Sequence, residues 1–95
     1  MDDGPESKRP AVTITYCVKC HFLPRATWVA QELLHTFADH VASVTLVPGS
    51  GGQFDVAIDG ETAWSTKTHG RFPETRELRE LIRLRLDNPP PPRHA

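Results

Sequence analysis

The residues with the clearest chemical potential are two cysteines separated by two positions, in Cys17-Val18-Lys19-Cys20. They are the only cysteines of the 95-residue chain. The hydrophobic run Ala11–Tyr16 precedes them, and a stretch with helical periodicity follows them. Two thiols at a strand-to-helix junction suit reversible dithiol–disulfide chemistry, because a helix N-terminus stabilises a thiolate and the second sulfur can close an intramolecular disulfide. Cys17 and Cys20 are therefore the candidate catalytic pair.

Basic side chains occur close to the cysteines and again in a later segment. Lys19 and His21 adjoin the pair, and a positive charge on either would lower the pKa of a neighbouring thiol. Lys67, His69 and Arg71 form a basic segment that could attract the carboxylates of a thiol substrate. An ordinary solvated turn explains this segment equally well, because exposed loop charges are common. All five residues are candidate binding residues.

The cysteines also satisfy a loose zinc pattern, Cys17-x2-Cys20-x14-His35-x4-His40. Two arguments count against it. Residues five apart on a helix differ by about 140°, so His35 and His40 do not share a face. A zinc finger also needs a hairpin around its cysteines, whereas here a strand leads in and a helix follows. We therefore expect no metal site.

Composition limits the classes of function. A net charge of −1 gives no electrostatic argument for binding nucleic acid or membranes. The acidic N-terminus does not resemble a signal peptide, and no apolar run approaches the length of a membrane span. We expect a cytoplasmic protein, and in that reducing compartment a CxxC pair is redox-active or metal-binding rather than structural.

The chain is organised as one small domain between two tails. Residues 1–10 and the proline-rich residues 88–95 are expected to be flexible, leaving a domain at 11–87. Within it we expect strands at Ala11–Tyr16, Val44–Val47, Phe54–Ile58 and Glu61–Thr66, and helices at Arg25–Val41, with Pro24 in its first turn, and at about Glu74–Leu86. The apolar stripe expected to be buried in the first helix is Ala26, Ala30, Leu33, Leu34, Phe37 and Val41.

The order β-α-β-β-β-α predicts an α/β two-layer sandwich with a mixed four-stranded sheet. The first two strands should be parallel neighbours joined by a right-handed crossover. If the third strand is antiparallel to the first, three segments meet at one end of the sheet: the CxxC pair and the loops Pro48–Gln53 and Lys67–Phe72. This convergence would bring the basic segment to the cysteines.

Several motifs together resemble the bacterial, cysteine-containing branch of the selenoprotein W-like family, which is grouped with selenoproteins T and H as the Rdx proteins. The resemblance covers roughly Thr13 to Leu86, and the combination of YCxxC with a late GRFPE is what makes it specific. The matching motifs are Tyr16-Cys17-x-x-Cys20, Leu23-x-Arg25-Ala26-x-Trp28-x-Ala30-Gln31-Glu32-Leu33-Leu34-x-Thr36-Phe37 and Trp64-Ser65-x-Lys67-x-x-Gly70-Arg71-Phe72-Pro73-Glu74.

The resemblance implies a thioredoxin-like fold with sheet order 4-3-1-2, two helices on one face and a redox-active CxxC. It also implies an antioxidant or thiol-regulatory role with glutathione as a suggested partner. Cys20 stands where selenocysteine occurs in the selenium-containing members, so its reactivity should be lower. Pro24 replaces a more usual aliphatic residue. No helix is expected between the second and third strands, which leaves one sheet face uncovered.

The first hypothesis for function is thiol–disulfide exchange without a resident cofactor, acting on thiol or disulfide protein clients or using glutathione as a co-substrate. The analogy with thioredoxin favours Cys17 as the attacking sulfur, and the family's selenium position favours Cys20. We favour Cys20, with Cys17 resolving. The alternative is a non-catalytic interaction module with a redox-gated surface. Its partner or dimer surface would lie near Trp28, which is almost opposite the core stripe, or on the open sheet face.

Overall fold

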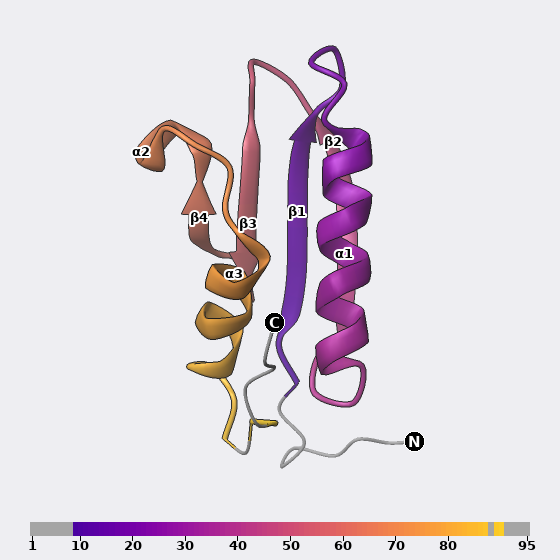
Figure 1. Ribbon diagram of the computed structural model, residues 1–95, viewed down its shortest axis with the longest axis vertical. Coiled ribbons are helices and arrows are strands. Elements are labelled where there is room, and N and C mark those ends of the chain that lie inside the picture. The colour runs from indigo at the N-terminus through magenta and orange to yellow at the C-terminus, as the bar shows by residue number, and fades with distance from the viewer. Residues whose placement is uncertain (1–8, 88, 91–95) are drawn as a thin grey trace.

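The computed structural model describes residues 9–87, 89 and 90. Most of the two expected tails, residues 1–8, 88 and 91–95, lies outside the described residues. The secondary structure elements are β1 Ala11–Cys17, α1 Leu23–Phe37, β2 Ser43–Gly49, β3 Phe54–Ile58, β4 Glu61–Ser65, α2 Thr66–His69 and α3 Thr75–Arg83 (Figure 1).

The four strands form one mixed sheet in the order β2-β1-β3-β4. β1 is parallel to β2 and antiparallel to β3, and β3 is antiparallel to β4. The expected order 4-3-1-2 is confirmed. The long β1–α1–β2 crossover accounts for the parallel pair, and the tight turn at Asp59-Gly60 accounts for the antiparallel hairpin of β3 and β4.

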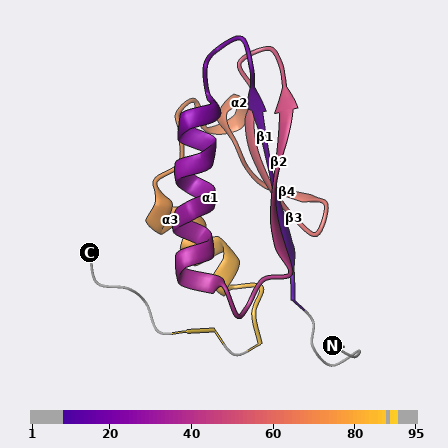
Figure 2. The ribbon, with the colours of Figure 1, turned by 90° about the vertical axis from the view of Figure 1, so that its right-hand side faces the viewer.

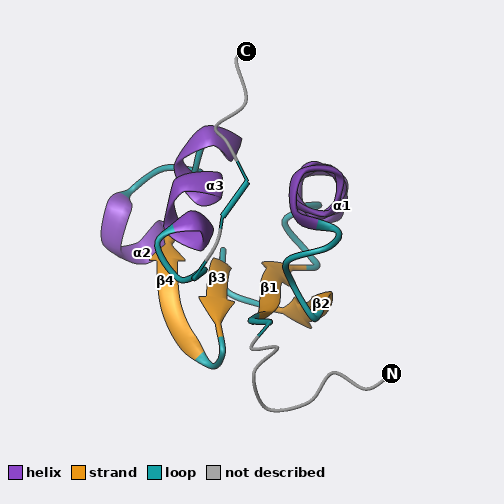
Figure 3. Cartoon of the chain, turned by 90° about the horizontal axis from the view of Figure 1, so that it is seen from below, coloured by secondary structure: helices purple, strands orange, loops and turns teal. Residues whose placement is uncertain are grey.

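The helices α1 and α3 lie on the same face of the sheet (Figures 2 and 3). The side chains of Val12 and Ile14 are fully buried beneath them, and their alternating neighbours Thr13 and Thr15 are only half-buried. This alternation follows from the period of two along a strand. Among the described residues, no helix covers the opposite face, as expected.

Helix α1 is shorter and rotated relative to the sequence-based expectation. It begins at Leu23, with Pro24 in its first turn, and ends at Phe37, four residues before the expected end. The buried stripe is Ala26, Val29, Leu33 and Phe37. The expectation for Leu34 is wrong, because its side chain is 42% exposed, and Ala30 is only half-buried.

The rotation of α1 has a physical cause in α3, which packs along one flank of the helix. Glu32 of α1 lies 4.0 Å from Arg79 of α3, and the guanidinium of Arg25 lies 4.3 Å over the ring of Phe72. Contact on this flank turns the buried stripe toward Val29 and away from Leu34. Residues far along the chain impose this contact, so the periodicity of the helix alone does not reveal it.

The segment between β4 and α3 contains a short helix where a loop was expected. β4 ends at Ser65, and the Ser65 hydroxyl accepts a hydrogen bond of 3.2 Å from the Lys67 N–H at the start of α2. Gly70 ends α2 with a φ of 72°, which favours glycine. α3 then begins with a capping box in which Glu74 and Glu77 bond each other's backbone N–H groups.

No helix in the described part of the chain is both long enough and apolar enough to cross a membrane.

The two adjacent leucines of α1 provide a matched test of the packing. Leu33 is fully buried and Leu34 is 42% exposed. We expect Leu33→Ala to lower the free energy of unfolding by about 2–5 kcal/mol, because it leaves a cavity between α1 and the sheet. Leu34→Ala should cost less than about 1 kcal/mol. Urea unfolding followed by circular dichroism measures both, and equal losses would contradict the rotation of α1.

Candidate functional site

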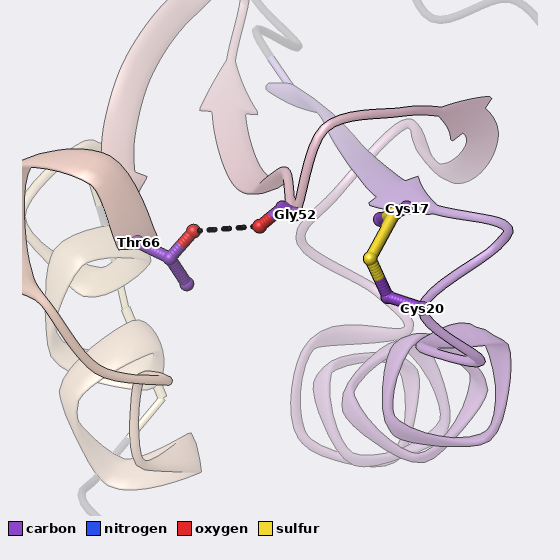
Figure 4. The surroundings of a disulfide bond; sticks show 4 residues. All are labelled: Cys17, Cys20, Gly52 and Thr66. Carbon is purple, nitrogen blue, oxygen red and sulfur yellow. Dashed lines mark hydrogen bonds between the residues drawn. A yellow bond between two sulfur atoms is a disulfide. The ribbon is translucent and has the colours of Figure 1, made fainter.

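The two cysteines form a disulfide bond at the junction between β1 and α1 (Figure 4). Cys17 is the last residue of β1, Cys20 lies in the following turn, and their Cα atoms are 5.3 Å apart. Cys17 is only 1% exposed, whereas Cys20 is exposed. One side of the disulfide is therefore open to a reactant and the other is protected.

Backbone hydrogen bonds fix the turn that carries the disulfide. The Cys17 N–H donates to the Gln53 carbonyl at 2.7 Å, and the Val18 N–H donates to the Gly49 carbonyl at 3.2 Å. The side-chain amide of Gln53 in turn donates to Asp55 at 2.8 Å. The loop after β2 thus holds the CxxC turn from one side, which confirms that these two segments converge.

Gly49 is required where this loop passes the end of β1. A Cβ atom built at Gly49 would lie 2.5 Å from Gln53 Oε1 and 2.8 Å from Thr15 Cγ2. A larger residue would force the side chains of Gln53 and Thr15 to move.

The start of α1 presents unpaired backbone groups near Cys20. The N-cap residue is Phe22, whose side chain cannot accept a hydrogen bond. The first turn of α1, all of which is described, contains no acidic residue. No side chain of α1 therefore neutralises the positive end of the helix dipole, which lies two positions after Cys20. This environment stabilises a thiolate at Cys20.

A groove of about 280 Å³ begins at Phe22, which follows the CxxC turn and donates its N–H to the Cys17 carbonyl, although neither cysteine lines the groove itself. The ring of Phe22 meets the ring of Phe72 edge-on, with centroids 4.9 Å apart. On another side, the Thr66 hydroxyl donates to the Gly52 carbonyl at 3.4 Å, close to the disulfide (Figure 4). The groove is lined by Phe22, Gly52, Thr66, Lys67, Gly70, Arg71 and Phe72.

The predicted binding residues occupy different environments. Lys19 and His21 are exposed beside Cys20, and Lys67 is exposed on the wall of the groove. His69 instead stacks on Trp64, with ring centroids 3.6 Å apart, and its Nδ1 lies 3.1 Å from the Ser65 carbonyl oxygen. Of the predicted basic segment, Lys67 is thus the residue most available to a ligand.

Arg71 lines the groove but is engaged by α3. Its guanidinium donates two hydrogen bonds to the Glu77 carboxylate, at 2.9 and 2.8 Å, and lies 4.8 Å over the ring of Trp64. The bonds from Arg71, with a further bond from the Glu74 N–H, lower the pKa of Glu77 to about 2, and the same pairing raises the pKa of Arg71. This pair could not be predicted from the sequence, because the six-residue separation of the two charges lies outside any regular helix period.

A larger hollow, of about 570 Å³, lies along α3, and neither cysteine lines it. Its arginines are each near a carboxylate: Arg76 is 2.8 Å from Glu74, and Arg83 is 3.5 Å from Glu80. Because their charges are compensated, this hollow offers a weaker attraction to an anion than its three arginines suggest.

The zinc pattern does not assemble into a site. The cysteines lie before the first turn of α1, whereas His35 lies in its last turn, about 18 Å farther along the helix axis. Across the described residues, no group of three or more His, Cys, Asp and Glu side chains could hold a metal ion.

A thioredoxin-like α/β fold with a CxxC disulfide at the end of its first strand defines a class of small thiol proteins, and comparison with known proteins agrees. The Rdx family model matches residues 11–84. The chain therefore belongs to the Rdx family, which confirms the resemblance to selenoprotein W. No curated protein matches the chain significantly.

Two solved structures support this assignment. A selenoprotein W-related protein from Vibrio cholerae is 37% identical, with a TM-score of 0.78, over 80% of this chain and 95% of that one. A protein from Bordetella parapertussis is 42% identical, with a TM-score of 0.80, over 83% of this chain and 100% of that one.

The Arg71–Glu77 pair generates a prediction about acid stability. Because the folded-state pKa of Glu77 is about 2, below its ordinary value of 4.5, its stabilising effect is complete above about pH 4.5 and is lost as the pH falls toward 2. We expect Glu77→Gln to lower the Tm at pH 7 and to have a diminishing effect across that window. Thermal unfolding at several pH values measures this, and a constant Tm difference would contradict it.

Proposed function

We propose that this chain is a thiol–disulfide redox protein in which Cys17 and Cys20 alternate between dithiol and disulfide. The observation that carries the proposal is the asymmetry of the pair: a buried Cys17 bonded to an exposed Cys20 at an uncapped helix N-terminus. Membership of the Rdx family supports a thiol redox role.

The reaction proceeds in two exchanges. In the reduced protein, the Cys20 thiolate attacks one sulfur of a substrate disulfide, so a mixed disulfide forms and the other substrate sulfur leaves as a thiolate that takes up a proton. The Cys17 thiolate then attacks the Cys20 sulfur, the intramolecular disulfide forms, and the second substrate sulfur leaves as a thiol. Two electrons and two protons pass to the substrate, and a cellular thiol reductant restores the dithiol by the reverse steps.

The roles of the two cysteines follow from access. Cys20 is the attacking sulfur because a substrate can reach it, and the helix N-terminus favours its thiolate. Lys19 and His21, when charged, favour the same thiolate. Cys17 reaches only the neighbouring sulfur, which suits a resolving residue.

The substrates that fit this site are thiols and disulfides of protein clients and of glutathione, with no resident cofactor. Lys67, and more weakly Lys19 and His21, favour a substrate that carries carboxylates. A reducing compartment such as the cytoplasm would supply the thiols that recycle the disulfide.

A non-catalytic interaction module is the second candidate, because the Trp28 side chain is 52% exposed on the outer side of α1. In that case a client would bind through Trp28 or the open sheet face, and the cysteines would act only as a redox gate. A double variant, Cys17→Ser with Cys20→Ser, separates the two: it abolishes turnover in the first case and leaves client binding intact in the second.

Single cysteine variants test the order of attack. Cys17→Ser should accumulate a mixed disulfide with a disulfide substrate, because Cys20 can attack but nothing resolves the product. Cys20→Ser should form at least about tenfold less adduct, because the remaining thiol is buried. Intact-protein mass spectrometry after reaction with glutathione disulfide measures both. Equal adduct on both variants would contradict the assignment, and no adduct on either would contradict the proposed function.

The charge of Lys67 tests substrate preference. Lys67→Gln should slow reduction of glutathione disulfide, an anionic substrate, by about two- to fivefold, because an exposed charge contributes up to about 1 kcal/mol. Reduction of the uncharged hydroxyethyl disulfide should not change.

The matched control for this measurement is Arg85→Gln, which removes the same charge beside Glu61, at the opposite end of the sheet. It should leave both rates unchanged. Equal slowing with both substrates would remove Lys67 from the binding site.

A further inference from the structure

The two edges of the sheet differ in how they are protected from pairing with another strand. β4 has five residues and a register irregularity against β3, and its Glu61 forms an ion pair of 3.1 Å with Arg85. Short length, irregularity and charge are the features that keep an edge strand from pairing. β2 has seven residues, Ser43–Gly49, and none of them is charged. Pro48, near the end of β2, is the only residue of this strand that lacks a backbone N–H group.

Helix α1 adds exposed apolar side chains beside this uncharged edge. Leu23 is 44% exposed and Leu34 is 42% exposed. Eleven residues of an α-helix rotate by about 1100°, so these two leucines lie within about 20° of each other on the helix surface, with the half-buried Ala30 between them. We call this line of residues the α1 flank.

The α1 flank faces the β2 edge rather than α3. The opposite side of the helix carries Glu32 and Arg25, which contact Arg79 and Phe72. Figure 3 shows the same arrangement, with β2 outermost in the sheet, α1 above it, and α3 on the other side of α1. The α1 flank extends about 16 Å from Leu23 to Leu34, and the seven residues of β2 extend about 23 Å, so the flank fits within the length of the β2 edge.

We propose that the β2 edge and the α1 flank form the interface of a symmetric dimer of this chain. In it, β2 of each copy pairs antiparallel with β2 of the other, so the two sheets continue into one of eight strands. A two-fold axis makes the contact self-complementary, because the same surface serves both copies.

The spacing of the elements fits this arrangement. α1 contacts both β1 and β2, so its axis lies above the pair. Since strands are about 4.8 Å apart, antiparallel pairing of the two β2 strands would place the two α1 axes about 10 Å apart. Helices pack directly at about 8–10 Å. Strand pairing therefore brings the exposed leucines of both copies into contact, without any movement of α1.

Charges at the two ends favour the antiparallel direction. Exposed Lys19 and His21 lie before the N-terminus of α1, and exposed Asp39 lies just after its C-terminus. An antiparallel two-fold axis brings Asp39 of one copy toward Lys19 and His21 of the other. The same arrangement places the two disulfides at opposite ends of the dimer, so both stay accessible.

Sedimentation equilibrium of the oxidised full chain, from low-micromolar to millimolar concentration, tests the proposal. We expect the average mass to rise from 10.6 kDa toward twice that value, because a small interface gives a reversible dimer. Thr45→Lys on β2 and Leu34→Lys on α1 should each raise the dissociation constant by at least about tenfold, since a lysine on an edge or in an apolar contact opposes pairing. Both side chains are exposed in the monomer, and circular dichroism would verify that each variant folds.

The matched control is Thr62→Lys, which makes the same substitution at an exposed position of the other edge strand, β4. It should change the dissociation constant by less than about twofold. Asp39→Lys should weaken the dimer, because it places like charges together at both ends. A mass of one chain at millimolar concentration, a dimer unaffected by Thr45→Lys and Leu34→Lys, or a dimer that Asp39→Lys does not weaken would overturn the proposal.

Discussion

The redox pair depends on the pairing of β1 along both of its edges up to its last residue. β1 pairs with β2 as far as Cys17 opposite Gly49, and with β3 as far as Tyr16 opposite Phe54. The loop from Gly49 to Gln53 then closes over the end of β1 through the hydrogen bond to the Cys17 N–H. A central strand bonded on both sides cannot shift its register without losing both ladders, so the position of Cys17 is fixed by the whole sheet. Cys20 lies beyond the ladder, in the turn, and only its disulfide joins it to the fixed Cys17, which explains how the two bonded sulfurs differ so much in exposure.

Two electrostatic effects act on Cys20, and their magnitudes are comparable. The uncapped helix end contributes roughly 0.3–1 kcal/mol to a nearby anion at an exposed site. Two unit charges about 4 Å apart in water interact by about 1 kcal/mol, and salt screens an exposed cation such as Lys19. The helix end is fixed by the backbone, whereas the lysine side chain is free to move. The helix end therefore provides the more constant stabilisation of the thiolate.

Much of the fold could be predicted from the sequence, because strands that are buried on one face carry a period of two that is visible locally. The alternation in Val12-Thr13-Ile14 and in Phe54-Asp55-Val56 indicates both the strands and the face that the helices cover. The redox pair could also be predicted, since the CxxC spacing and the strand before it are both local. Two features depend on contacts outside the local periodicity and could not be predicted. One is the rotation of α1 that buries Val29, and the other is the pairing of Arg71 with Glu77.

The same limit explains why the basic segment 67–71 does not act as a unit. The sequence alone does not distinguish its three basic residues. In the structure, Trp64 attracts two of them, because His69 stacks on one part of the indole and Arg71 lies over the ring while accepting the indole N–H at 3.4 Å on its carbonyl. Trp64 itself is 5% exposed. Trp64 thus engages the side chains of His69 and Arg71, whereas Lys67 lines the groove.

Exposed surface around the sheet also divides into two chemically different regions. The open face carries threonines such as Thr13, Thr15 and Thr45, whose hydroxyl groups remain hydrated and lose water at a cost when a partner binds. The α1 flank exposes leucine side chains, which gain free energy when they leave water, at about 25 cal/mol per Å² of apolar surface. Although the open face is the broader of the two, the hydrophobic effect favours association at the edge, where backbone groups on β2 also gain partners.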